Sequence, residues 1–131
     1  MLTARDIMTE DVVTISPTAT VQEAIELLLL QRISGLPVTD PQGMLIGIVT
    51  EFALLAIAYD ENIREEKVLK HMTSDLITVG PNDPIRKVAD LCIVHRVRRV
   101  PVVENGRLLG LIARCDVLDG VYRTLQEPCS V

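Results

Sequence analysis

The feature that most constrains the fold of this chain is an internal repeat. Met8-Thr9 aligns with Met72-Thr73 at an offset of 64 positions, and the match continues to Pro41, which has no counterpart. Beyond that one-residue gap the offset is 63, so that Gly47 aligns with Gly110. Two copies that differ by a single gap predict two equivalent structural units within one chain.

Both copies show the same order of elements, β-α-β-β-α, after a short helical lead-in. Apolar residues recur at helical spacing in the first helix of each copy, and turn residues separate the strands that follow. The pattern predicts lead-ins at 4–8 and 68–72, strands at 12–15 and 76–79, hairpins at 36–50 and 100–113, and last helices from Glu51 and Arg114. The expected fold class is therefore α+β (mixed α/β).

Helix starts and turns can be read directly in both copies. Residues 20–23 form a capping box, in which the Thr side chain accepts from the amide of the Glu and the Glu side chain reaches back. In the second copy, Asp83 is the expected N-cap and Pro84 the first helical residue. Residues 40–43 and 104–106 fit tight hairpin loops.

The repeat also sets the expected domain boundaries. The first repeat covers residues 1–60 and the second residues 68–123, with the charged residues 61–67 as a linker and 124–131 as a tail. The helix EFALLAIA at 51–58 is apolar on nearly all sides, so it must be buried on more than one side. The other repeat would cover one side, and a second copy in a symmetric homodimer would cover the rest.

Length, charge and hydropathy argue against several function classes. A chain of 131 residues with 48% hydrophobic residues can bury a core as one domain. Its net charge of −5 argues against binding to nucleic acid or to an anionic membrane surface. The longest apolar run, at 52–58, is too short to span a bilayer, and the N-terminus lacks the apolar stretch of a secretory signal.

Residues that could carry metal or catalytic chemistry form no recognisable arrangement. The three cysteines, Cys92, Cys115 and Cys129, lack zinc-site spacing, and their odd number predicts reduced thiols in a cytoplasmic protein. Cys92 falls on the core side of its helix, so we interpret it as a core residue. His71 and His95 are not spaced for a metal or paired with a nucleophile. We therefore expect no metal site, no catalytic residue and no enzyme activity.

The repeated segments resemble a tandem pair of CBS domains, also called a Bateman module. The resemblance covers residues 1–123 and rests on RDIMTEDVVTISPTATVQEAIELL, on GLPVTDPQGMLIGIVT and on the second copy of each segment. It implies two repeats packed through their sheets with pseudo-two-fold symmetry, which leaves two clefts between the repeats. It also implies a disc-shaped homodimer that regulates another protein.

The resemblance further implies the class of ligand. Many modules of this family bind adenosine-containing molecules in the clefts, among them AMP, ADP, ATP and S-adenosylmethionine, and serve in energy sensing. No cofactor is then required, and the regulated partner would be a separate protein. The expected function is a regulatory module that senses an adenine nucleotide.

The family motif places polar residues at the start of the last helix of each repeat. A helix N-terminus suits phosphate, a Thr there adds a hydroxyl, and an Asp three residues later can accept from both ribose hydroxyls. The two positions are Thr50 and Ala53 in the first copy, and Ala113 and Asp116 in the second, so each copy keeps one polar residue. Both also have ordinary interpretations, Thr50 as an N-cap and Asp116 as an acid in a first helical turn.

Arginines distinguish the second copy. Arg98 and Arg99 precede its Pro-containing strand, where members of the family direct basic residues at phosphate, whereas the first copy has Ser34 and Gly35. A guanidinium suits bidentate phosphate contact, although a solvated basic edge is the alternative. Arg114 opposes the helix dipole, which favours an anion nearby. The expected nucleotide-binding residues are Asp116 for ribose, Thr78, Val79 and Ile112 around the base, and Arg98, Arg99 and Arg114 for phosphate, together with Pro81 and, from the first repeat, Thr14 and Thr50.

A second hypothesis treats the incomplete motifs as relics. On this interpretation the chain is a ligand-free dimerisation or protein-interaction module, and the apolar helix at 51–58 is its functional surface. Binding of an adenine nucleotide separates the two hypotheses.

Overall fold

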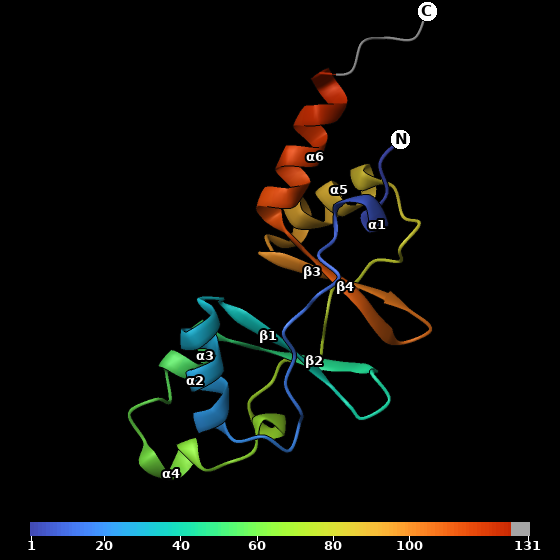
Figure 1. The fold of residues 1–131 in the computed structure, drawn as a ribbon. Coiled ribbons are helices and arrows are strands. Elements are labelled where there is room, and N and C mark those ends of the chain that lie inside the picture. The colour runs from blue at the N-terminus through green and yellow to red at the C-terminus, as the bar shows by residue number, and fades with distance from the viewer. Residues whose placement is uncertain (127–131) are drawn as a thin grey trace, which may run out of the picture. The chain divides into compact units, whose positions relative to one another are not determined.

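The computed structural model describes residues 1–126, which form two compact units (Figure 1). Unit 2 is continuous and contains Val13–Leu76, whereas unit 1 combines Met1–Val12 with Ile77–Val131. The lead-in of each sequence repeat therefore belongs to the unit that the other repeat forms. Residues 127–131, with Cys129 and most of the expected tail, lie outside the described residues.

Unit 2 is built on a two-stranded antiparallel hairpin, extended by a single bridge on each side. Strand β1 (Gly35–Thr39) pairs with β2 (Leu45–Thr50). Ile15 adds a parallel bridge to β1 at Val38, and Thr73 adds an antiparallel bridge to β2 at Ile48. The helices of this unit are α2 (Val21–Gln31), α3 (Glu51–Leu55), α4 (Glu61–Arg64) and the 3-10 turn η1 (Val68–Lys70).

Unit 1 repeats this plan with equivalent residues. Strand β3 (Arg99–Glu104) pairs with β4 (Arg107–Ala113), Val79 bridges β3 at Val102, and Thr9 bridges β4 at Leu111. Its helices are α1 (Ala4–Ile7), α5 (Ile85–His95) and α6 (Arg114–Gln126). Helix α6 continues beyond residue 123, where the sequence repeat was expected to end.

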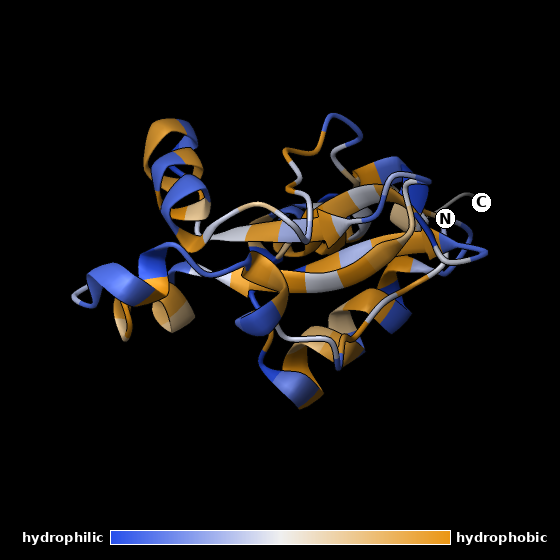
Figure 2. Cartoon of the chain, turned by 90° about the horizontal axis from the view of Figure 1, so that it is seen from below, coloured by the Kyte–Doolittle hydropathy of each residue, from blue (hydrophilic) through white to orange (hydrophobic). Residues whose placement is uncertain are grey.

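Aliphatic side chains fill the core of each unit, and the strands are hydrophobic for most of their length (Figure 2). In unit 1 the sheet residues Val100, Val102 and Ile112 are fully buried together with Val88 of α5. Leu36, Val38 and Val49 take the same positions in unit 2. Strands β1 and β3 are buried at four and three consecutive residues, and the helices place apolar residues at i, i+3, i+4 spacing on the core side.

Each lead-in passes so close to a strand that the strand has a glycine at the crossing, where a larger residue would not fit. A Cβ added at Gly110 would lie 2.6 Å from Met8 Sδ and 2.9 Å from the Thr9 carbonyl oxygen. A Cβ at Gly47 would meet Met72 Sδ at 2.5 Å. The Met-Thr pair of each lead-in therefore packs on the glycine of a strand, and the same contact occurs in both units.

Most predicted elements are confirmed. The capping box is present, since Thr20 Oγ1 accepts from the Glu23 amide at 3.1 Å and Glu23 Oε2 accepts from the Thr20 amide at 3.3 Å. The second hairpin turns at Asn105 and Gly106, whose φ values of 53° and 82° are the left-handed pair that a tight two-residue loop requires.

Three local predictions are wrong. The strands at 12–15 and 76–79 are reduced to the single bridges at Ile15 and Val79. Asp83 does not cap α5: its Oδ2 accepts from the Gly80 amide at 2.7 Å, and Pro84 is the N-cap residue. The helix expected at 51–58 ends at Leu55 and is followed by turns up to Asp60, which caps α4.

Candidate functional site

The start of α6 gathers several of the predicted residues in unit 1. Strand β4 leads directly into this helix, and its last residue, Ala113, pairs with Arg99 at the start of β3. The Arg114 amide donates to the Arg98 carbonyl oxygen at 2.9 Å. Register and this bond together bring three arginines and the first turn of α6 to one end of the hairpin.

Asp116 lies in that first turn and is half-buried. Its Oδ2 accepts from the Ala113 amide at 3.2 Å, which is the contribution of a helix N3 acid to a capping box. The Cys115 thiol makes a long hydrogen bond to Asp116 Oδ1, with Sγ and Oδ1 4.0 Å apart. One carboxylate oxygen is thus used by the helix start, and the other retains most of its accepting capacity.

Thr50 makes the complementary half of the same box in unit 2. Its Oγ1 accepts from the Ala53 amide at 3.2 Å at the start of α3. The two repeats therefore keep different polar residues, yet each residue satisfies one backbone donor of its own helix. The ordinary structural interpretation of Thr50 and Asp116 is realised, and the Thr50 hydroxyl proton and the second Asp116 oxygen remain open to a ligand.

The predicted base-binding residues in unit 1 differ in accessibility. Val79 is 3% exposed and Ile112 is fully buried, so their side chains belong to the core. The backbone of Val79 is also occupied, since its amide donates to Pro101 at 3.0 Å and its carbonyl accepts from Val103 at 2.8 Å. Thr78 is exposed, and among the described residues none forms a hydrogen bond with it.

Pro81 and Thr14 complete the predicted set. Pro81 is buried, and its carbonyl accepts from the Arg5 amide at 2.9 Å, so it anchors the lead-in helix α1. Thr14 is exposed in unit 2, directly before the Ile15 bridge, as Thr78 is before the Val79 bridge. Of the ten predicted residues, Thr14 and Thr50 belong to unit 2 and the others to unit 1.

Charge near the start of α6 comes from exposed arginines. Arg98 and Arg114 are both exposed to solvent. Burial raises the pKa of the Cys92 thiol on α5, and the positive charge of Arg114 opposes this rise. Cys92 therefore stays a protonated thiol packed against the core of unit 1, as the sequence indicated.

One polar cluster in unit 2 was not predicted from sequence. Glu66 Oε1 lies 2.9 Å from His71 Nε2, and Lys70 Nζ lies 3.5 Å from Glu66 Oε2. The hydrogen bond with His71 is the main cause of the lowered pKa of Glu66. The Glu66 carbonyl also accepts from the Val21 amide, so this cluster fastens the start of η1 to α2.

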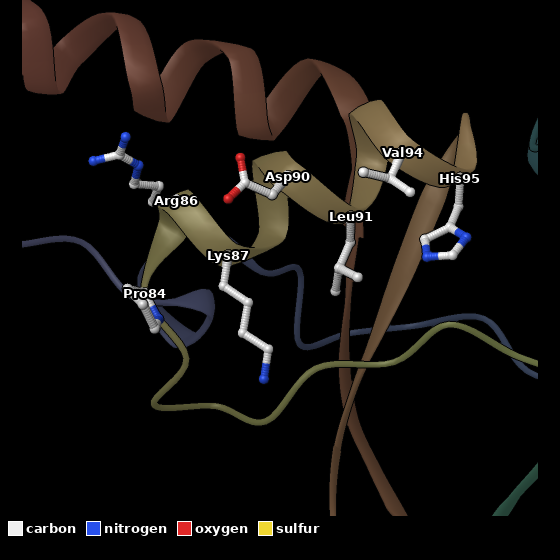
Figure 3. Close-up of a pocket in the computed structure, with 7 residues that line it drawn as sticks. All are labelled: Pro84, Arg86, Lys87, Asp90, Leu91, Val94 and His95. Atoms are coloured by element: carbon white, nitrogen blue, oxygen red, sulfur yellow. The ribbon is translucent and has the colours of Figure 1, made fainter.

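A shallow depression of about 380 Å³ lies along the outer side of α5 (Figure 3). Lys87, Leu91 and His95 are among its lining residues, and it contains none of the predicted nucleotide-binding residues. Its walls come from a single helix and the proline before it, so it lacks the convergent polar groups of an enclosed ligand site.

No helix within residues 1–126 combines the length and apolar character needed to cross a membrane. The same residues contain no cluster of three or more His, Cys, Asp or Glu side chains that could hold a metal ion.

Comparison with known proteins gives matches over nearly the whole chain. A family model for the CBS domain matches twice, at residues 4–60 and 66–123. Uncharacterized protein MJ1225 of Methanocaldococcus jannaschii is 32% identical over 114 residues, which are 87% of this chain and 41% of that protein. The chain thus spans about two fifths of that relative's length.

Two solved structures that share the fold are complexes with adenosine-containing molecules. CBSX2 of Arabidopsis thaliana in complex with AMP matches with a TM-score of 0.86 and 28% identity, over 95% of this chain and 99% of that chain. The CBS domain pair of protein MJ0100, in complex with 5'-methylthioadenosine and S-adenosyl-L-methionine, matches with a TM-score of 0.80 and 26% identity. That match covers 95% of this chain and 98% of the other.

Proposed function

Because this chain belongs to the CBS domain family and contains two CBS domains in tandem, we propose that it is a regulatory module whose unit 1 binds an adenosine-containing nucleotide. The proposed ligands are AMP, ADP, ATP and S-adenosylmethionine. Complexes of similar CBS pairs with AMP and with S-adenosyl-L-methionine support this class of ligand. Binding would act on a separate partner protein, and no chemistry on the nucleotide is proposed.

The observation that carries the proposal is the chemical difference between two equivalent helix starts. At the start of α6, Asp116 supplies a carboxylate while Arg98 and Arg114 supply positive charge. At the start of α3, Ala53 stands in the place of Asp116, Ser34 in the place of Arg98 and Glu51 in the place of Arg114. A ribose acceptor and phosphate-binding cations therefore occur together in unit 1 alone, although the two backbones are equivalent.

Each residue of the proposed site has a defined task. Asp116 Oδ1 accepts from the ribose hydroxyls while Oδ2 remains on the Ala113 amide. Arg98, Arg99 and Arg114 bind phosphate, next to the positive end of the α6 dipole. The base is read by the backbone of Thr78, because Val79 and Ile112 contribute only buried side chains that hold the sheet in place.

Regulation would follow from a difference in affinity. A nucleotide can shift this protein between two states, free and partner-bound for example, only by binding one state more tightly. The same coupling must then appear in reverse, so that the partner changes the affinity for nucleotide.

Calorimetric titration of AMP, ATP and S-adenosylmethionine tests the proposal. Asp116→Ala should weaken binding about tenfold to a hundredfold, because a charge-assisted hydrogen bond contributes about 1.5–3 kcal/mol. Asp119→Ala is the matched control, since Asp119 is an exposed carboxylate one turn further along α6 that pairs with Arg123 at 3.2 Å. Absence of any ligand tighter than about 1 mM would refute the nucleotide function.

A second candidate function is supported by exposed apolar side chains. Phe52, Leu55 and Tyr59 are 83%, 66% and 93% exposed on α3 and the turn that follows it. An apolar surface of this kind marks a protein contact. We propose that a second copy of the chain covers it in a homodimer, which is compatible with nucleotide binding and would remain as the function if no nucleotide binds.

A further inference from the structure

The lead-in of the first repeat runs along unit 1 and contacts both segments that carry the proposed nucleotide site. We call residues 2–9 the strap, which includes α1 and ends at the Thr9 bridge to β4. Helix α1 packs against α6 and against β4 (Figure 1). All of these elements belong to unit 1, so the strap and the site at α6 are parts of one compact unit.

One end of the strap holds the segment 81–85, which closely follows Thr78. Three backbone hydrogen bonds make this attachment, from the Ala4 amide to the Asp83 carbonyl oxygen at 2.8 Å, from the Arg5 amide to that of Pro81 at 2.9 Å and from the Ile85 amide to that of Leu2 at 3.0 Å. The backbone proposed to bind the base at Thr78 is therefore continuous with a segment that the strap fixes.

The other end of the strap holds β4 just before the start of α6. The Thr9 amide donates to the Leu111 carbonyl oxygen at 2.9 Å, and the Leu111 amide donates to the Thr9 carbonyl oxygen at 3.0 Å. Ala113, whose amide donates to Asp116 Oδ2, ends the same strand. A displacement of the strap at Thr9 would therefore displace the strand that positions the proposed ribose acceptor.

Helix α6 also packs directly on the strap, at Gly120. This glycine is buried, and a Cβ added there would lie 3.2 Å from Ile7 Cγ2 and 3.8 Å from Leu2 Cδ1. Ala4 and Ile7 of the strap are themselves buried in the core of unit 1. The strap therefore joins α6, which supplies Asp116, to the segment that follows the base-binding backbone.

Unit 2 contains an equivalent strap without the equivalent site. Thr73 and Ile48 exchange the same pair of backbone hydrogen bonds, at 2.8 and 2.9 Å. The helix start that this second strap supports has Ala53 in the place of Asp116. Unit 2 therefore offers a comparison in which the same attachment serves the fold alone.

We propose that the strap is a positioning element of the nucleotide site in unit 1 and that its attachment is coupled to nucleotide binding. This inference rests on the nucleotide function proposed above and adds a route for its regulation. The base and the ribose bind to two segments that the strap joins, so the site is complete only while the strap is attached. Detachment of the strap must then lower the affinity for nucleotide, and bound nucleotide must stabilise the attachment to the same extent.

Thr9→Pro tests the coupling in the full chain. Thr9 is exposed, and proline removes the amide that donates to Leu111, while Met8 already has the extended backbone that a following proline favours. Calorimetry should show AMP binding about fivefold weaker than in the wild type, because one backbone hydrogen bond of the strap is lost. Thr73→Pro is the matched control, since it removes the equivalent bond to Ile48 from an exposed residue of unit 2.

The control separates a positioning role from a loss of stability. Urea unfolding should show that Thr9→Pro and Thr73→Pro are destabilised by similar amounts, because each loses the same backbone bond. The affinity of Thr73→Pro for AMP should nevertheless stay within about twofold of the wild type.

Hydrogen exchange of the wild-type protein gives a second test that needs no variant. With AMP at about ten times its dissociation constant, exchange at the Thr9 and Leu111 amides should slow about tenfold, because the state with a detached strap does not bind nucleotide. Exchange at the Thr73 and Ile48 amides should slow less than about threefold, since opening of the second strap leaves the site at α6 intact.

The outcomes distinguish the coupling from the nucleotide function. If AMP binds and Thr9→Pro has no more effect on its affinity than Thr73→Pro, the coupling is overturned while the site at α6 stands. Equal slowing of exchange in the two units has the same meaning, and it decides the question if Thr9→Pro does not fold. A wild-type protein that binds no nucleotide overturns the proposed function and the coupling with it.

Discussion

Replacing Gly110 by Ala should loosen the lead-in from unit 1. The added Cβ would lie 2.6 Å from Met8 Sδ, 2.9 Å from Met8 Cγ and 2.9 Å from the Thr9 carbonyl oxygen. The methionine side chain can adopt another rotamer, but the carbonyl belongs to the backbone and is fixed by its bridge. That carbonyl accepts from the Leu111 amide at 3.0 Å, and the Thr9 amide donates to Leu111 at 2.9 Å.

The size of the effect follows from these contacts. Overpacking a close contact costs about 1–3 kcal/mol, and each hydrogen bond lost with the bridge costs about 1 kcal/mol more. We therefore expect Gly110→Ala to lower the free energy of unfolding by about 2–4 kcal/mol. A loss of that size is a large fraction of the stability of a small protein.

Urea unfolding monitored by circular dichroism measures this loss, and hydrogen exchange at the Thr9 and Leu111 amides locates it. Gly80→Ala is the matched control, because its added Cβ would come no closer than 3.7 Å, to Asp83 Oδ2. That variant should be neutral or slightly more stable, since Ala restricts the unfolded chain. If Gly110→Ala unfolds within 0.5 kcal/mol of the wild type, the described contact of lead-in and strand is wrong.

Three further predictions concern the dimer, pH and the second hairpin. Leu55→Asp should convert a dimer into a monomer in sedimentation experiments, while Leu69→Asp, at an exposed leucine of η1 outside the proposed contact, should not. The hydrogen bond from the Gly80 amide lowers the pKa of Asp83 from its ordinary value of 3.8. The ionised carboxylate therefore stabilises the fold fully at neutral pH, and this stabilisation is lost as the pH falls below 3.8. In Asp83→Asn the free energy of unfolding should depend less on pH in that range. Asn105→Val should destabilise the chain by about 1–2 kcal/mol in urea unfolding, because a β-branched residue resists φ of 53°.

Sequence reasoning predicted the elements that depend on local patterns. The capping box at Thr20 and the turn at Asn105 were predicted because both rest on residue chemistry within a few positions. The exchange of lead-ins between units was not predicted. Periodicity describes each segment alone, whereas the position of Met8 against Gly110 depends on contacts across most of the chain.

The wrong predictions have physical causes of the same kind. Asp83 fits the chemistry of an N-cap, but the nearer Gly80 amide takes its carboxylate. The segment at 76–79 has strand propensity, but it lies alongside β3 only at Val79, where it forms a single bridge. Strand propensity reflects how well the side chains suit a half-buried sheet surface. It does not determine over how many residues a neighbouring strand runs beside the segment.

The candidate site was predictable as a set of positions but not in its detailed roles. Register alone brings Arg98, Ala113 and Arg114 together once the hairpin and the following helix are assigned. Ile112 was expected beside the base but is fully buried, and the use of Asp116 Oδ2 by the Ala113 amide required the actual helix geometry. The capping bonds also explain why two copies keep different polar residues: each residue holds its own helix start.

The most direct test of the central claim is an amide NMR titration of the wild-type protein with AMP. Binding at α6 predicts the largest shift changes at Thr78 and at residues 113–116, with little change at the equivalent residues Thr14 and 50–53 of unit 2. Asp116→Ala should strongly reduce these changes at an AMP concentration near the wild-type dissociation constant. Equal changes at both helix starts, or changes confined to residues 50–53, would contradict a nucleotide site based on Asp116.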